Sequence, residues 1–293
     1  MKFLRFPPPG KMALILIPFL LTGCGERYFL FNTAGPVAEI ERNLIYTTFV
    51  LTAIVVIPVI ALMFYIIRRF RDTPDNPAPY RPEWAQSHRL EFVVWGVPIL
   101  IICVLGVVTV RDTFRLVRPT TSMSGTPLTI QVTSLDWKWL FQYPDQKIAT
   151  VNYCEIPTNR PVRFILTSDA PMNSFWVPQL GGQEYTMPGM AMRLWLQADK
   201  PGSYFGSGAN FSGREFAHMK FNVIAKSEND FQQWIQQTKS TAPALTKAGY
   251  QKLTQQNVVD KQTFSSFPSG VFEQNIKSEG GMYMKHELKE ATD

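Results

Sequence analysis

The chain is short of the residues from which metal sites, disulfide frameworks and nucleic-acid surfaces are built. Its 293 residues include three cysteines and three histidines, too few for a disulfide scaffold and little material for a metal site. Charged residues make up 18%, whereas soluble proteins usually have about 25%. The net charge is +6, but no block of like charge is present, which argues against a nucleic-acid partner. The low charge instead indicates apolar segments that a water-soluble core does not need.

The N-terminus has the features of a bacterial lipoprotein signal. A basic start precedes an apolar run, residues 12–21, which is shorter than the roughly 20 residues needed to span a bilayer. The run ends in Leu21-Thr22-Gly23-Cys24, which resembles the lipobox in which the cysteine is lipidated before the chain is cut. We therefore expect residues 1–23 to be a signal peptide and Cys24 to carry a covalent lipid. The alternative is a chance cysteine after an apolar run.

Two longer apolar segments follow. Residues 44–67 and 92–110 contain no charged side chain, and each is long enough to cross the hydrocarbon core as a helix. Pro58 and Pro98 interrupt the two segments, which membrane helices tolerate where neighbouring groups satisfy the freed carbonyl oxygens. Two buried helices of a soluble domain are the alternative, but uncharged runs of this length favour membrane spans.

The arginines between the two apolar segments predict their orientation. Five lie in the connecting loop, residues 68–91, against two in residues 24–43 and three in residues 111–126. The positive-inside rule then places the loop in the cytoplasm, and residues 24–43 together with everything after residue 110 in the periplasm. Lipidation of Cys24 would occur on the outer side of the inner membrane. Both arguments predict a multi-pass protein of the bacterial inner membrane.

The residues after the second apolar segment predict a β-domain. Residues 111–126 form a linker, and from there short runs of β-forming residues alternate with Gly, Pro and Asn turns. This pattern predicts an all-β sandwich over residues 127–226. The predicted strands include residues 128–132, 161–166, 192–196 and 221–224.

Residues 227–293 are expected to form a helical extension and a disordered tail. Phe231, Trp234 and Ile235 have the spacing of one helix face. A second helix is expected over residues 241–255, and disorder from about residue 278, where glycine and charged residues dominate.

An aromatic stretch stands out within the predicted sandwich. Trp137, Trp139, Phe141 and Tyr143 alternate along one run, so on a strand their side chains share a face. That face is either the packed interior of the sandwich or a contact surface for a partner. A second unusual segment, residues 202–219, is a loop rich in glycine and serine that precedes the last predicted strand.

With these features assembled, the chain resembles subunit II of the haem-copper respiratory oxidases from Cys24 to about residue 270. The matching motifs are the Glu-Phe-Val-Val-Trp-Gly-Val-Pro run at 91–98, the aromatic stretch at 137–143, and residues 173–181 and 187–189. The resemblance implies a membrane protein in which a two-helix transmembrane hairpin is followed by an all-β cupredoxin-like sandwich and a short helical C-terminal extension.

In the cytochrome c oxidase branch of that family the sandwich holds a two-copper centre. The resemblance places its first histidine ligand at Asn173, and its two cysteines at Gly208 and Ser212. The remaining positions, a glutamate that binds through its backbone, a second histidine and a methionine, fall on Asn210, Phe216 and Met219.

Only the methionine is retained at these positions, so we expect no metal on this chain. A rescued site built from Cys154 and His218 would have too few ligands.

A cupredoxin shell without copper resembles the ubiquinol oxidase branch of the cytochrome bo type. The resemblance implies subunit II of a proton-pumping enzyme that oxidises ubiquinol and reduces oxygen to water. Haems and copper would reside in subunit I, and the partners would be subunit I, smaller subunits and membrane lipid. The alternatives are a cytochrome c oxidase subunit II with an unusual copper site and a stand-alone membrane lipoprotein.

Four residues are candidates for roles in such a complex. Trp137 and Trp139 are candidate contacts with subunit I, unless they belong to the core. Glu91 lies one residue before the second uncharged segment. In the family that the chain resembles, a glutamate at this place lies at the mouth of a proton channel of subunit I, so Glu91 is a candidate for proton uptake. His88 is a candidate substitute for it. A plain helix-start carboxylate is the alternative.

Overall fold

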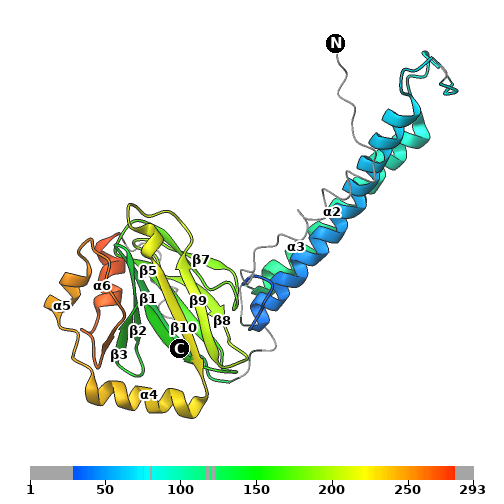
Figure 1. Cartoon of the computed structure of the whole chain (residues 1–293). Coiled ribbons are helices and arrows are strands. Elements are labelled where there is room, and N and C mark those ends of the chain that lie inside the picture. The colour runs from blue at the N-terminus through cyan, green and yellow to red at the C-terminus, as the bar shows by residue number, and fades with distance from the viewer. Residues whose placement is uncertain are drawn as a thin grey trace.

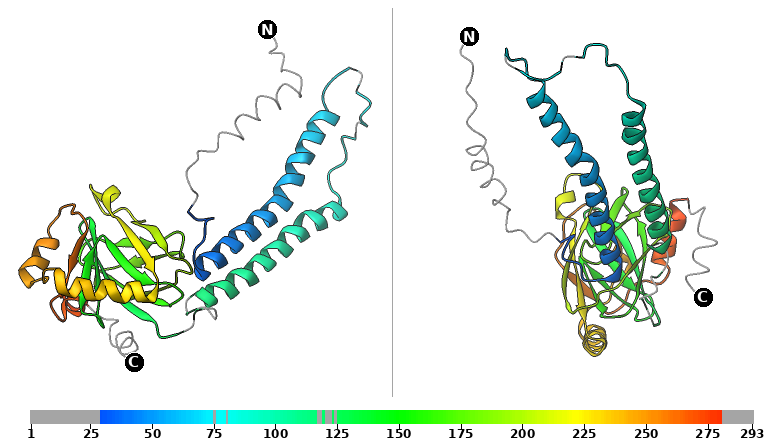
Figure 2. Two further views of the ribbon diagram at one scale, coloured as in Figure 1. Left: turned by 60° about the horizontal axis from the view of Figure 1, so that its bottom comes forward. Right: turned by 90° about the vertical axis from the view of Figure 1, so that its right-hand side faces the viewer.

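The computed structural model describes residues 29–74, 76–79, 81–116, 119, 123 and 125–280. Two long helices extend from one side of a β-sandwich that is flanked by shorter helices (Figure 1), and the turned views in Figure 2 show the same arrangement. The expected signal peptide, Cys24 and most of the expected disordered tail lie outside the described residues.

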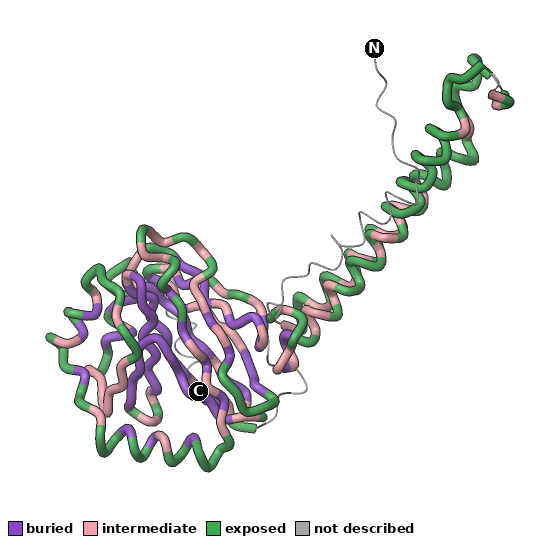
Figure 3. The backbone as a smooth tube through the Cα atoms, viewed as in Figure 1, coloured by how far each residue is buried: buried purple, intermediate pink, exposed green. Residues whose placement is uncertain are grey.

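The two apolar segments form the cores of the long helices α2 (Pro36–Arg69) and α3 (His88–Leu116). Proline at the first position of α2 suits a helix start, because an N–H at that position has no partner within the helix. The most apolar windows of the two helices have mean hydropathies of 2.9 and 2.7, and neither window is buried within the chain. Figure 3 shows the long helices largely exposed and the sandwich interior buried. A core helix of a soluble protein would be covered, so this bare apolar surface favours the predicted membrane spans.

The sandwich consists of two sheets. The first has six strands in the order β11-β3-β2-β1-β5-β8, and the second has five in the order β4-β10-β9-β6-β7. The strands of the first sheet are β1 (Leu128–Leu135), β2 (Lys138–Tyr143), β3 (Ile148–Val151), β5 (Val162–Ser168), β8 (Met192–Leu196) and β11 (Gln262–Phe264). Those of the second are β4 (Tyr153–Pro157), β6 (Asn173–Trp176), β7 (Gln183–Thr186), β9 (Gly202–Gly208) and β10 (Lys220–Lys226). The four strands that the sequence predicted correspond to β1, β5, β8 and β10.

Strand β2 shows why the first sheet is buried on both faces. Trp139, Phe141 and Tyr143 join the core between the two sheets, as the alternation of the sequence predicts. Leu140 faces the other side, where it packs in a second cluster with Leu253 and other residues of the C-terminal extension. Every residue of β2 is therefore buried, and the extension acts as a third layer of the domain.

Up to residue 280, the C-terminal extension contains helices and one strand. Helix α4 (Glu228–Thr241) is capped by the Ser227 hydroxyl, and it buries Phe231 and Ile235 on the predicted face. The second predicted helix is shorter than expected: α5 (Lys247–Leu253) begins after Thr246, whose hydroxyl accepts the Gly249 N–H. The extension then adds β11, which pairs antiparallel with β3, and its last described helix is α6 (Val271–Ser278). The strand was not predicted from the sequence.

A buried lysine ties the extension to the sandwich. The Lys138 side chain points away from the inter-sheet core, and its Nζ donates hydrogen bonds to the carbonyl oxygens of Leu253 and Gln255 at 2.8 and 2.7 Å. Leu253 is the last residue of α5 and Gln255 follows it by two residues, in the region where carbonyl oxygens have no partner within the helix. Burial lowers the pKa of Lys138 to about 8, while the nearby Asp136 acts in the opposite direction.

The long helices are joined to the sandwich through a tight seam. Asp199 N–H donates to the Ala34 carbonyl and Ala34 N–H to the Gln179 carbonyl, both at 2.8 Å. Three glycines make the close approach possible: a Cβ atom would lie 2.1 Å from the Gln197 carbonyl oxygen at Gly35, 2.6 Å from Leu196 Cδ2 at Gly181, and 2.5 Å from Glu41 Oε1 at Gly182. The start of α2 therefore packs directly on the sandwich.

Candidate functional site

Four of the positions that the resemblance assigns to copper ligands meet at one end of the sandwich. Asn173 begins β6 and Gly208 ends β9, while Ser212 and Met219 flank the short 3-10 helix η1 (Phe216–His218). The Asn173 amide donates hydrogen bonds to Ser212 Oγ and to Met219 Sδ, both at 2.9 Å. The Ser212 hydroxyl donates to the same sulfur at 3.3 Å. We call Asn173, Gly208, Ser212 and Met219 the Asn173 cluster.

The Asn173 cluster is closely packed. Asn173 is fully buried and Met219 is 1% exposed. A Cβ atom on Gly208 would lie 2.8 Å from Asn173 Oδ1. The side-chain amide of Asn173 therefore occupies the space that a side chain at position 208 would need. The Gly208 N–H donates to the Met219 carbonyl at 2.8 Å, which joins the two ends of the loop. Hydrogen bonds among its own side chains hold this end of the sandwich together.

The donor set of the Asn173 cluster does not fit a two-copper centre. It offers an amide, a hydroxyl and a thioether, whereas copper electron-transfer sites use thiolate and imidazole ligands. Within the described residues no group of three or more His, Cys, Asp or Glu side chains is placed to hold a metal ion. The cluster can pack and hydrogen-bond, but it lacks the ligands for redox chemistry.

The other two assigned positions lie outside the cluster. Asn210 is half-buried and donates from Nδ2 to the Met172 carbonyl at 3.1 Å. The Phe216 ring stands against that of Phe211, with a centroid distance of 5.7 Å, and Phe211 is 77% exposed.

The two residues considered for a rescued copper site are also apart from the cluster. Cys154 is fully buried in the core between the sheets, and burial raises the pKa of its thiol. His218 is exposed and lies 3.5 Å from a carboxylate oxygen of Glu215.

Trp137 and Trp139 lie in the core, which corrects their assignment as partner contacts. Trp139 is fully buried, with edge-to-face contacts to Phe175 and Phe221, both at 5.5 Å between ring centroids. Its Nε1 donates to the Met219 carbonyl at 3.4 Å. Trp137 is 7% exposed. Neither ring has an exposed face for a partner, because the aromatic stretch fills the interior of the sandwich.

Trp137 differs from the sequence prediction in a second way. Strand β2 starts at Lys138, and Leu135 pairs with Lys138, so Asp136 and Trp137 form a two-residue turn. Trp137 has φ of 64°, a left-handed conformation that is unfavourable for a bulky residue. Its Nε1 donates to the Ser212 carbonyl at 3.3 Å. The turn therefore supports the loop of the Asn173 cluster, a role that alternation alone did not reveal.

Glu91 and His88 lie at the opposite end of the long helices from the sandwich, in the first turn of α3. The Glu91 carboxylate is 3.4 Å from His88 Nδ1, and both side chains are more than half exposed. The Glu91 N–H donates to the Ser87 carbonyl at 2.9 Å. The two candidates for proton uptake are thus neighbours on one helix turn.

Comparisons with known proteins match both parts of the chain. A family model described as cytochrome c oxidase subunit II, periplasmic domain, matches residues 147–226. Quinol oxidase subunit 2 of Bacillus cereus is 44% identical over 261 residues, which cover 87% of this chain and 89% of the relative. Cytochrome bo(3) ubiquinol oxidase subunit 2 of Pseudomonas aeruginosa is 46% identical over 242 residues, or 82% of this chain and 72% of the relative.

A solved structure, the periplasmic domain of subunit II of cytochrome oxidase from Bradyrhizobium japonicum, is also similar. It is 23% identical with a TM-score of 0.38, and the match covers 39% of this chain and 94% of that structure.

Proposed function

The chain belongs to the subunit II family of the quinol oxidases, and from this premise we propose that its complex oxidises ubiquinol, reduces oxygen to water and pumps protons. The observation that carries the proposal is the identity of 44 to 46% with quinol and ubiquinol oxidase subunits over more than four fifths of the chain. Similarity of that extent includes the helices as well as the sandwich.

Within that complex this chain binds no redox metal. The Asn173 cluster supplies one thioether and no thiolate or imidazole, and a quinol, which is soluble in the bilayer, needs no copper relay in the periplasmic domain. The haems, the copper and the main quinol site belong to subunit I. The sandwich keeps the cupredoxin-like fold but has lost the two-copper centre. The ligands of such a centre would stand at the positions of the Asn173 cluster.

The remaining role of the chain is structural. Helices α2 and α3 have bare apolar surfaces, which subunit I, smaller subunits and lipid cover in the inner membrane. The sandwich lies in the periplasm, where the seam at Gly35 and Gly181 holds it against the start of α2. The arginine-rich loop 68–91 lies in the cytoplasm. A lipid on Cys24 adds a second anchor to the two spans.

Glu91 takes part in proton uptake at the cytoplasmic side. Its carboxylate is exposed in the first turn of α3, beside His88, and α3 carries the uncharged segment of the second span. A carboxylate at the edge of a membrane span is expensive unless it meets water, a partner or a proton path.

Purification through a tag on this chain tests the proposal. We expect the chain to co-purify with a large haem-containing membrane subunit, and the complex to oxidise ubiquinol but not reduced cytochrome c. Turnover with cytochrome c would instead support a cytochrome c oxidase. Isolation of this chain alone, without haem absorbance, would support a stand-alone lipoprotein.

A further inference from the structure

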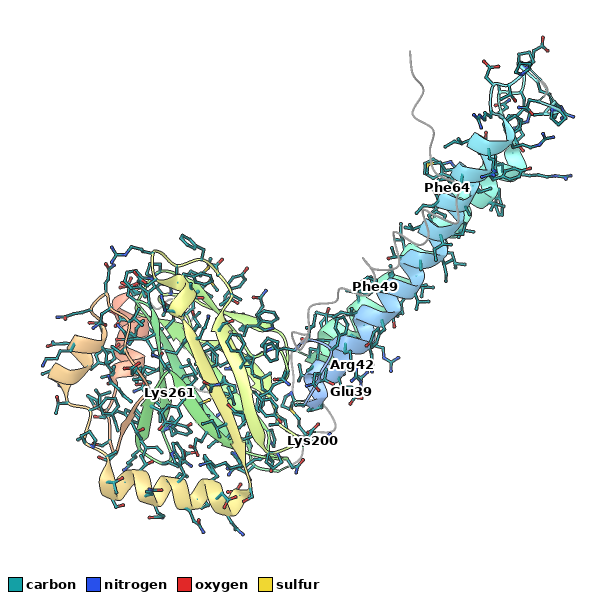
Figure 4. All side chains as sticks on the ribbon, in the orientation of Figure 1. Glu39, Arg42, Phe49, Phe64, Lys200 and Lys261 are labelled. Atoms are coloured by element: carbon teal, nitrogen blue, oxygen red, sulfur yellow. The ribbon has the colours of Figure 1, made fainter. Side chains whose placement is uncertain are left out.

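A cavity of about 470 Å³ lies at the end of the two long helices that is far from the sandwich. Phe70, the C-cap residue of α2, lines it together with residues of the connecting loop, namely Pro79, Arg81, Pro82 and Trp84. Phe70 follows the uncharged segment 44–67 by three residues, so the cavity lies where the predicted membrane span ends. Figure 4 labels Phe64 near this end of α2. We call the cavity the Trp84 pocket.

The side chain of Asn76 holds the loop against the end of α2. Its Nδ2 donates hydrogen bonds to the carbonyl oxygens of Arg69 and Arg71 at 3.2 and 2.6 Å. Carbonyl oxygens at a helix end have no partner within the helix, so the amide satisfies groups that would otherwise need water. Its Oδ1 accepts the Ala78 N–H at 3.0 Å, which turns the chain back toward the pocket.

A second turn and several prolines form the wall of the Trp84 pocket. The Trp84 N–H donates to the Arg81 carbonyl at 3.3 Å, so these two residues belong to one turn. Each proline fixes its own φ, and the loop has four of them within nine residues, at positions 74, 77, 79 and 82. The wall is therefore stiff, and its volume is within the range of small-molecule sites.

The Trp84 pocket combines an apolar wall with one cation. Phe70 and Trp84 are 54% and 63% exposed, which is unfavourable for large apolar side chains unless another molecule covers them. Arg81 is the sole charged residue among the described ones that line the pocket. Its guanidinium group has no hydrogen-bond or ion-pair partner in the part of the chain that the structure describes. The pocket thus offers a free cation beside apolar surface.

The charges around the pocket favour an anion as its occupant. Arg68, Arg69 and Arg71 lie beside it at the end of α2. The described carboxylates of residues 70–84 belong to Asp72 and Glu83, and neither lines the pocket. Basic residues next to a membrane span attract anionic lipids through the negative potential of the membrane surface.

We infer that the Trp84 pocket binds an anionic phospholipid, with the phosphate group on Arg81 and the glycerol and upper acyl chain against Phe70 and Trp84. A guanidinium group donates paired hydrogen bonds to a phosphate, and tryptophan is favoured at the boundary between acyl chains and water. The inference rests on the proposed placement of α2 and α3 in the membrane, but it is independent of the substrate that the complex oxidises.

A phospholipid matches the pocket better than a free phosphate ion does. A phosphate ion would engage Arg81 and leave the rings of Phe70 and Trp84 in water. A phospholipid engages the same cation and also covers the apolar wall, which adds the favourable burial of that surface.

Photolabelling of the intact complex tests the inference. The complex is placed in phosphatidylcholine nanodiscs that contain a small, subsaturating fraction of photoreactive phosphatidylglycerol, and adducts are mapped by peptide mass spectrometry. We expect adducts within residues 70–84. Photoreactive phosphatidylcholine should give about tenfold fewer, and an excess of inorganic phosphate should leave the labelling unchanged.

Variants of the pocket should lower this labelling. Arg81→Gln should lower it about tenfold, the effect of losing hydrogen bonds between charged groups. Arg81→Lys keeps the charge but not the paired geometry, so its labelling should lie between those of Arg81→Gln and the wild type. Trp84→Ala, which removes the largest part of the apolar wall, should lower the labelling several-fold.

Arg89→Gln is the matched control. Arg89 is exposed in the first turn of α3 and does not line the pocket, yet its substitution removes the same charge from this end of the helices. This variant should therefore label like the wild type. The haem content of each sample confirms that the variant assembles.

Several outcomes overturn the inference. These are equal labelling of wild type and Arg81→Gln, equal labelling by phosphatidylglycerol and phosphatidylcholine, and adducts confined to other segments. An equal loss of labelling in Arg89→Gln also overturns it, because the charge of the loop as a whole would then attract the lipid. Displacement of the label by inorganic phosphate would identify a site for free anions instead.

The proposed function is tested separately on the same samples by ubiquinol oxidation. A complex that oxidises ubiquinol but gives no adduct within residues 70–84 overturns the lipid site alone. A complex that is labelled there but oxidises no quinol overturns the proposed function and leaves the lipid site in place.

Discussion

The side-chain amide of Asn173 donates a hydrogen bond to the sulfur of Met219 at 2.9 Å. The resemblance to the copper-binding branch places a histidine ligand and a methionine ligand at these two positions. Here Ser212 bonds to both side chains, and Trp139 donates to the Met219 backbone. Direct hydrogen bonds thus connect β6 to the loop before β10.

The first prediction is that the chain binds no copper in its sandwich. Incubation of the purified chain with copper should give neither a stoichiometric metal content nor a visible absorption band. A triple variant, Asn173→His, Gly208→Cys and Ser212→Cys, should gain a coloured site beside Met219, because it restores one imidazole and two thiolates. A Cβ atom at 208 would lie 2.8 Å from the present Asn173 Oδ1, so the side chain at 173 must turn aside in this variant. A purple or blue chromophore in the wild type would contradict the loss of the copper centre.

A second prediction concerns the seam between α2 and the sandwich. Gly35 has an extended backbone that any residue adopts, but a Cβ atom there would lie 2.1 Å from the Gln197 carbonyl oxygen. Gly35→Ala should therefore weaken the seam by about 1–3 kcal/mol, the usual effect of overpacking. Hydrogen exchange of the Ala34 and Ala38 amides, which donate to sandwich carbonyls, should become faster.

Gly106→Ala is the control for this seam. A Cβ atom at Gly106 in α3 meets nothing within 4 Å in the chain, so exchange at Ala34 and Ala38 should stay as in the wild type. Equal protection of these amides in Gly35→Ala would mean that the seam adjusts to the extra methyl group.

The sequence was sufficient to predict the elements whose patterns are local. Uncharged runs predicted the cores of α2 and α3, and period-two alternation predicted β1, because each pattern reports burial of one continuous segment. It also predicted the buried face of α4 from Phe231 and Ile235. The motif positions brought Asn173 and Met219 together only through the family resemblance, since 46 residues separate them.

Other features depend on contacts that a single segment does not reveal. The sequence left open whether Trp139 belongs to the core, because alternation says which side chains share a face but not what covers that face. Strand β11 has three residues of intermediate burial, and it is defined by pairing with β3. The contact of Glu41 with the sandwich was not predicted, because a glutamate near a helix start is common and Gly182, which lies against its carboxylate, is far along the chain.

A third prediction concerns Glu91. Glu91→Gln should slow oxygen reduction while haem content and assembly stay intact. The loss should be partial, well below the roughly 100-fold or more typical of removing a group that transfers a proton in the reaction itself, since His88 is 3.4 Å away. The Glu91→Gln/His88→Ala double variant should lose more.

The control for Glu91 is Glu83→Gln. Glu83 is exposed in the loop that precedes α3, and its substitution should leave turnover unchanged. Full turnover of the double variant across the pH range would leave Glu91 as a helix-start residue only.

The last prediction is that stability of the chain rises with pH between about 8 and 10.5 because of Lys138. Burial lowers the pKa of this lysine to about 8 in the folded state, from its ordinary value of 10.5. Within that window the unfolded chain binds more protons than the folded chain, so raising the pH favours folding. Below pH 8 both states are protonated and the folded state bears the full cost of the buried cation. Above 10.5 both are neutral and that cost is absent. The neutral amine still has two N–H groups for the Leu253 and Gln255 carbonyls.

The Lys138→Met variant separates the pH dependence of stability that Lys138 causes from that of the other ionisable groups. Methionine is close to lysine in length but has no donor, so the two carbonyls lose their partner, and the variant should be less stable by roughly 1–3 kcal/mol near pH 7. Denaturant midpoints of both proteins, followed by tryptophan fluorescence at pH 7.5, 8.5 and 9.5, give the comparison. The difference in denaturant midpoint between wild type and variant should grow with pH. Only the wild type has a buried ammonium group at position 138, and losing its proton removes the unfavourable burial of that charge. A difference that stays constant or shrinks would show that the lysine keeps its ordinary affinity for the proton in the folded chain.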